Sequence, residues 1–136
     1  MLPTEVFISH SSADQPFVAS LVEVLRRYGV AVWYAPAEII GAQEWHDEIG
    51  AALRRCDWFL IILSSNAVNS MWVKRELMFA LNEARYKGRI VPLLFQPCDY
   101  GILSWTLSAY QFVDFTQNFE DGCRSLLRVW ELEYEM

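Results

Sequence analysis

The residue types best suited to chemistry follow an apolar run, residues 58–63, which reads Trp-Phe-Leu-Ile-Ile-Leu. A segment rich in serine and asparagine comes next, and Trp72 and Glu76 lie just beyond it. Because they are four residues apart, both side chains project from one face if this segment is helical. A half-buried carboxylate beside an indole is desolvated, which raises its pKa and suits it to acid–base catalysis or to stabilising a cation. The alternative is a surface glutamate that pairs with Lys74 or Arg75.

Other polar residues follow the predicted strands. The hydroxyls of Ser9, Ser64 and Ser65 and the ring of His10 could donate hydrogen bonds to a phosphate or a ribose. The alternative is strand-end and helix-capping chemistry. Neither His10 nor His46 stands with Cys or Asp at metal-ligand spacing, so we expect no metal site. Glycine-rich phosphate loops are absent, which argues against a Rossmann mode of nucleotide binding.

Composition limits the class of protein. The chain has 136 residues, is 54% hydrophobic and carries a net charge of −6, which predicts one domain over residues 1–136 and disfavours binding to nucleic acid or to an anionic membrane. The three cysteines have no metal-like spacing. We see no signal peptide and no apolar stretch long enough to span a bilayer, so we expect a cytoplasmic protein with reduced thiols.

Hydrophobic periodicity predicts alternating strands and helices. Apolar positions at helical spacing begin at Phe17, Trp45 and Val73, with stops near Gly29 for the first helix and Gly88 for the third; a final helix is expected over 119–131. The segment 35–44 is expected to be a loop, and 96–109 to be irregular with one weak helical turn. The expected strands are 4–9, 30–34, 57–63, 90–95 (interrupted by Pro92) and 111–115.

This alternation favours a flavodoxin-like α/β fold: a five-stranded parallel sheet in the order 2-1-3-4-5 with helices on both faces. Strands 1 and 3 then open a crevice at their carboxyl ends, flanked by the loops 9–14 and 64–70, with loop 35–44 beside them. Glu76 precedes Leu77 of the core stripe by one position, about 100° around the helix. We therefore expect Glu76 to flank the buried face, close to this crevice.

Three segments in order resemble the Toll/interleukin-1 receptor (TIR) domain family. Val6 to Ser12 is similar to the family's first box, and Val32 to Pro36, continuing through Gly41 and Trp45, is similar to the BB-loop region of bacterial members. Leu63 to Ser65, continuing through Ser70 to Glu76, resembles the strand–loop–helix that carries the W-x-x-x-E motif. The resemblance covers essentially the whole chain and implies the TIR fold.

Many TIR domains of this kind cleave NAD⁺ at the nicotinamide–ribose bond, and the resemblance places the essential glutamate at Glu76. Loss of neutral nicotinamide leaves an oxocarbenium-like ribosyl cation that one carboxylate can stabilise. The resemblance implies NAD⁺ as substrate with no separate cofactor, and leaves ADP-ribose and a cyclic isomer open as products. The expected substrate-binding residues are Phe7, Ser9, His10, Trp33, Tyr34 and Trp72, and the expected lid or assembly loop is Glu38, Ile39, Ile40 and Gly41.

The resemblance leaves other functions open. Some TIR domains are scaffolds that bind other TIR domains, and the apolar pair Ile39-Ile40 suits such a contact. Scaffolding members usually lack the glutamate found here at Glu76, which favours an enzyme, in bacterial immune or anti-phage signalling and activated by self-association. A nucleotide sensor without turnover is a third possibility. The chain departs from the bacterial pattern at Ala42, where a glycine is frequent, and at Ala35-Pro36, where an acidic residue is common.

Overall fold

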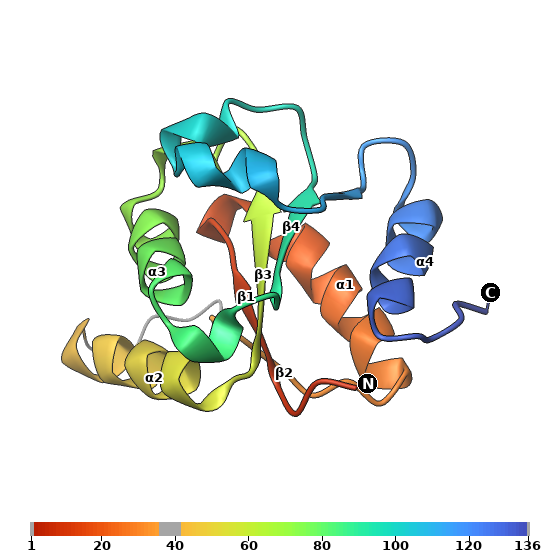
Figure 1. Cartoon of the computed structure of the whole chain (residues 1–136), viewed down its shortest axis with the longest axis horizontal. Helices are drawn as coiled ribbons and strands as arrows, with labels where there is room; N and C mark the ends of the chain where they lie inside the picture. The colour runs from red at the N-terminus through yellow and green to blue at the C-terminus, as the bar shows by residue number, and fades with distance from the viewer. Residues whose placement is uncertain (1, 36–41, 136) are drawn as a thin grey trace.

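In this computed structural model, residues 2–35 and 42–135 are described, without the side chains of residues 42–45. The strands form one five-stranded sheet in the order β2-β1-β3-β4-β5, and every neighbouring pair is parallel. The predicted fold class and strand order are therefore confirmed (Figure 1). The strands are β1 (Val6–Ser9), β2 (Val32–Tyr34), β3 (Trp58–Leu63), β4 (Ile90–Leu94) and β5 (Val113–Asp114). The helices are α1 (Gln15–Arg27), α2 (Ala42–Arg55), α3 (Met71–Leu81) and α4 (Phe119–Val129).

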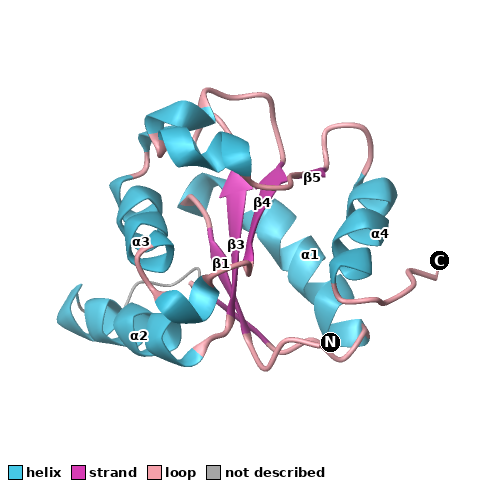
Figure 2. Cartoon of the chain, in the orientation of Figure 1, coloured by secondary structure: helices cyan, strands magenta, loops and turns pink. Residues whose placement is uncertain are grey.

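The helices cover both faces of the sheet, as Figure 2 shows, with α1 and α4 on one side and α2 and α3 on the other. Successive side chains of a strand point to opposite faces. In β1, Val6 and Ile8 join the core formed with α1 and α4, whereas Phe7 joins the core formed with α2 and α3. This alternation determines which residues of β1 and β2 can reach Glu76.

Helix α3 is held at both ends by local contacts. Ser70 caps its N-terminus, since its hydroxyl accepts a hydrogen bond from the Val73 amide at 3.3 Å. The helix ends at Leu81, and Glu83 has extended backbone angles, so the predicted continuation towards Gly88 is wrong. A separate 3₁₀ turn, η3 (Ala84–Tyr86), follows. Within the described ranges, no helix combines the length and the apolar character needed to cross a membrane.

Three other boundaries differ from the prediction. Helix α2 begins at Ala42, inside the expected loop. Strand β5 is limited to Val113–Asp114, and two 3₁₀ turns, η4 (Tyr100–Ile102) and η5 (Trp105–Ala109), occupy the segment predicted to be irregular. Strand β4 runs through Pro92 without interruption. The Phe95 amide donates to the carbonyl of Leu63 in β3. Because the backbone groups of successive residues point to opposite neighbouring strands, the backbone groups of Pro92 point towards β5, and β5 pairs with β4 only from Leu93 onward. The missing N–H of proline is therefore tolerated.

Candidate functional site

Glu76 lies in the interior, between α3 and the end of β1. Its side chain is part of the buried stripe of α3 and is 8% exposed. The hydroxyl of Ser9 donates a hydrogen bond to Oε1 of Glu76 at 2.7 Å. Burial raises the pKa of Glu76 to about 7, and the Ser9 hydrogen bond opposes this shift. The predicted rise in pKa is confirmed, and Glu76 is more deeply buried than a residue that only flanks the core.

A pocket opens over Glu76 between α2 and α3. Its volume is 240 Å³. The indole of Trp72, 42% exposed, forms part of its wall, with its centroid 6.4 Å from the ring of His46. The pocket combines an ionisable carboxylate with apolar and aromatic walls, which is typical of a ligand site. Its lining residues are His46, Ile49, Gly50, Leu53, Arg54, Trp72, Arg75, Glu76 and Phe79.

The other predicted substrate-binding residues divide between the two faces of the sheet. Phe7 and Trp33 lie on the face of Glu76, and their rings stack with centroids 5.1 Å apart. Phe7 is fully buried, so Trp33, half-buried, is the more accessible of the two. Tyr34 packs against the core of the opposite face, and its ring centroid lies 6.3 Å from that of His10. The sheet therefore groups Ser9 and Trp33 with Glu76, and His10 with Tyr34.

His10 is held in a defined tautomer. Its Nδ1 lies 2.8 Å from the carbonyl oxygen of Ser11, which can only accept, so Nδ1 carries the proton. Nε2 is then an acceptor, and it is buried without a hydrogen-bond partner among the described residues. Burial lowers the pKa of His10 and favours this neutral form.

The serines after β3 have structural partners. The hydroxyl of Ser64 donates to the buried carboxylate of Asp14 and accepts a hydrogen bond from the Ala67 amide at 3.0 Å. The Ser65 hydroxyl donates to Gln96 at 3.3 Å. The Ser64 contact joins the β3–α3 loop to the β1–α1 loop, and the Ser65 contact joins it to the segment after β4. Both support the alternative of strand-end chemistry for these two serines.

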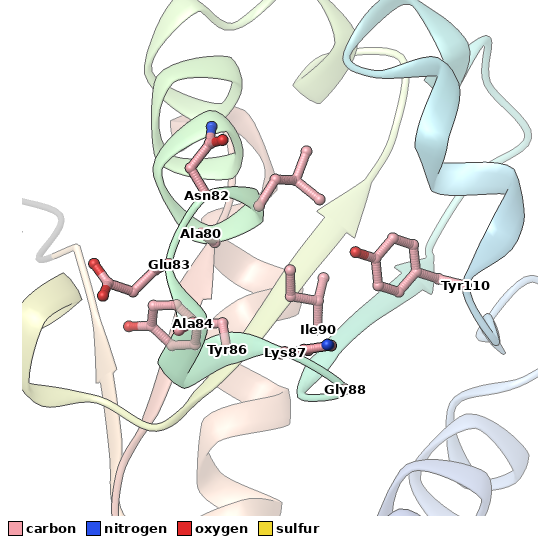
Figure 3. Close-up of a pocket in the computed structure, with 10 residues that line it drawn as sticks. Ala80, Asn82, Glu83, Ala84, Tyr86, Lys87, Gly88, Ile90 and Tyr110 are labelled. Carbon is pink, nitrogen blue, oxygen red and sulfur yellow. The ribbon is translucent and has the colours of Figure 1, made fainter.

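A larger cavity of 360 Å³ lies at the opposite end of α3 (Figure 3). Tyr110 reaches it from the segment before β5, and Glu83 and Lys87 contribute exposed or half-buried charges. Tyr86 also lines it, but its hydroxyl donates to the carbonyl of Leu53. Among the described residues, no buried carboxylate lines this larger cavity. The smaller pocket over Glu76 contains one, so we take the smaller pocket as the candidate site.

The pocket contains residues that sequence reasoning did not select. His46, Arg54 and Phe79 line it because α2 packs beside α3. The hydrophobic pattern of either helix alone does not predict that the two helices pack together. The spacing of Ile49 and Leu53 was a signal for the buried face of α2, since both face the core and also line the pocket. The predicted lid residues Glu38, Ile39, Ile40 and Gly41 lie outside the described residues.

Comparisons with known proteins agree with this architecture. The NAD(+) hydrolase TcpC of Escherichia coli is 35% identical to this chain over 83 residues, which are 60% of this chain and 27% of that protein. A probable 2′ cyclic ADP-D-ribose synthase, TcpO of Methanobrevibacter olleyae, is 24% identical over 91 residues, which are 66% of this chain and 27% of that protein. This chain therefore spans just over a quarter of the length of these curated relatives.

Solved structures show the same fold at low identity. The TIR domain of the Toll-related receptor TRR-2 from Hydra magnipapillata has a TM-score of 0.73 and 19% identity, covering 91% of this chain and 95% of that domain. The TIR domains of the activated Roq1 resistosome have a TM-score of 0.68 and 16% identity, covering 93% of this chain and 98% of theirs. The family model described as "TIR domain" matches residues 6–127, from β1 into α4. On this match, the chain belongs to the TIR domain family.

Proposed function

We propose that this chain cleaves NAD⁺ at the nicotinamide–ribose bond and that Glu76 is its catalytic carboxylate. The observation that carries the proposal is the buried Glu76 side chain, which is hydrogen-bonded to Ser9 at 2.7 Å and lines a pocket together with Trp72. The curated relatives, one named a hydrolase of NAD⁺ and one a probable cyclic ADP-ribose synthase, support the same substrate.

The chemistry fits a single carboxylate. When the C–N bond breaks, both electrons go to the pyridinium nitrogen, so nicotinamide leaves neutral and the ribosyl carbon becomes cationic. A carboxylate in a low-dielectric pocket stabilises such a cation more strongly than it would in water. Water then attacks the ribosyl carbon and releases a proton, giving ADP-ribose, or a nucleophile within the same molecule closes a cyclic isomer. Glu76 acts in its ionised form, and Trp72 offers an aromatic wall to the substrate.

Nicotinamide release tests the proposal. Purified protein, at high concentration and with a crowding agent, is incubated with NAD⁺ and nicotinamide is followed by chromatography, with Glu76→Gln beside the wild type. Loss of a positioned catalytic carboxylate is expected to reduce the rate by about 10²-fold or more. Glu48→Gln, which removes an exposed carboxylate from α2, is the matched control and is expected to keep wild-type activity.

The outcomes separate the functional classes. Release by the wild type and the control alone supports the enzyme, and the co-product distinguishes hydrolysis from cyclisation. Turnover that persists in Glu76→Gln would remove Glu76 from the catalytic role. If no protein releases nicotinamide even at high concentration, where self-association is favoured, the non-catalytic TIR–TIR scaffold becomes the better assignment.

A further inference from the structure

Two arginines line the Glu76 pocket, one from each of the helices that form it. Arg54 belongs to α2 and Arg75 to α3. The guanidinium of Arg54 folds back along its own helix, since a Cβ added to Gly50 would lie 3.4 Å from one of its nitrogens. The guanidinium carbon of Arg75 lies 5.7 Å from the centroid of the Trp72 ring. Both arginines line the pocket and remain exposed to solvent.

Neither guanidinium has an ion-pair partner among the side chains that the structure describes. The ion pairs within residues 2–35 and 46–135 do not include Arg54 or Arg75, whereas the adjacent Arg55 pairs with Glu5 at 2.6 Å. Glu76 is not their partner either, because its carboxylate accepts the Ser9 hydroxyl and no ion pair joins it to a guanidinium among the described side chains. Two positive charges thus remain available to a ligand in this pocket.

We propose that Arg54 and Arg75 form a subsite for the pyrophosphate of a dinucleotide, beside the carboxylate of Glu76. This inference rests on the proposed function and names the part of the substrate that the arginines hold. Guanidinium groups bind phosphate oxygens through paired N–H donors.

The size of the pocket and the order of charges fit this assignment. A volume of 240 Å³ is below the roughly 300–1,000 Å³ of typical ligand pockets, so it accommodates a fragment such as one ribose with its phosphate. In NAD⁺ the reacting ribose connects directly to the pyrophosphate. A ribosyl carbon beside the anionic Glu76 therefore brings the anionic phosphates towards Arg54 and Arg75.

Binding of ADP-ribose, measured by calorimetry, tests the subsite without requiring turnover. Arg54→Gln and Arg75→Gln are each expected to weaken binding by about 10-fold, the low end of what a charged hydrogen bond contributes. The controls, Arg55→Gln and Lys74→Gln, remove exposed cations from the neighbouring positions of the same two helices and are expected to change the dissociation constant less than twofold. Thermal unfolding of every variant establishes that each is folded.

A ligand without phosphate separates phosphate binding from general damage to the pocket. Nicotinamide riboside is expected to bind equally to the wild type and to all four variants. Equal loss for both ligands, equal loss in the controls, no loss in the pocket variants, or no binding of ADP-ribose by the wild type would each overturn the subsite. A wild type that binds ADP-ribose through both arginines but releases no nicotinamide would keep the subsite and refute the catalytic proposal.

Discussion

Replacing Glu76 by glutamine should make the protein more stable at neutral pH, and the gain should grow with pH. In the folded state Glu76 keeps its proton up to about pH 7, because burial disfavours the charge. In the unfolded chain the carboxyl ionises near its ordinary value of 4.5. Between these values the folded state binds more protons, so unfolding becomes easier as the pH rises.

The size of the effect follows from the pKa. One pKa unit corresponds to about 1.4 kcal/mol, so a rise from 4.5 to about 7 represents roughly 3 kcal/mol of unfolding free energy. The wild type is expected to lose this amount between pH 4.5 and 7, whereas Glu76→Gln has no proton to release. Glutamine keeps the shape and can accept the Ser9 hydroxyl, so the two proteins should be nearly equal at pH 4.5.

Urea unfolding, followed by the fluorescence of the six tryptophans, measures the difference at several pH values from 4.5 to 7.5. Other groups that titrate in this range, such as His10, contribute to both proteins and cancel in the subtraction. Glu23→Gln removes an exposed carboxylate from α1 and is the control, expected to differ from wild type by less than about 0.5 kcal/mol throughout. A Glu76→Gln difference that stays constant with pH would refute the reasoning.

Three further predictions concern the surroundings of the site. Ser9→Ala removes a hydrogen bond that lowers the pKa of Glu76, so the rise of kcat/KM for NAD⁺ with pH should move to higher pH; an unchanged pH profile would contradict this. Asp14→Ala leaves the buried hydroxyl of Ser64 without its acceptor, and urea unfolding should show a loss of about 1–3 kcal/mol. Gly122→Ala would bring a Cβ within 2.2 Å of the Phe115 ring, and thermal unfolding should reveal a destabilisation of about 1–3 kcal/mol; wild-type stability in either variant would count against the packing described.

The strand order and the position of Glu76 were predictable because both depend on local signals. Strand and helix alternate clearly in hydrophobicity, and parallel sheets then restrict the strand order to a few choices. The position of Trp72 and Glu76 on the same helix followed from helical spacing. The same local logic failed at Pro92, because tolerance of a proline depends on which neighbour its missing N–H would have met.

The composition of the pocket required tertiary information. Arg54 and Phe79 line the same pocket because α2 packs beside α3, and the sequence alone does not show which helices pack together. By contrast, one division of the predicted site residues was available from strand geometry: alternate positions of a strand face opposite sides, so Trp33 and Tyr34 could not both approach Glu76 along one face. The resemblance to the family named both as substrate-binding residues, and the period of two places their side chains on opposite faces of the sheet.

The place of Glu76 within α3 is itself an argument for function. Val73, Leu77 and Ala80 complete the buried stripe to which it belongs, and an apolar or amide side chain there would avoid a penalty of roughly 3 kcal/mol at neutral pH. A carboxylate that breaks the local pattern, with one hydroxyl as its partner and a pocket above it, is the kind of departure expected at functional sites. If Glu76→Gln is both more stable and inactive, the two results together mean that the chain keeps a destabilising charge where the chemistry needs it.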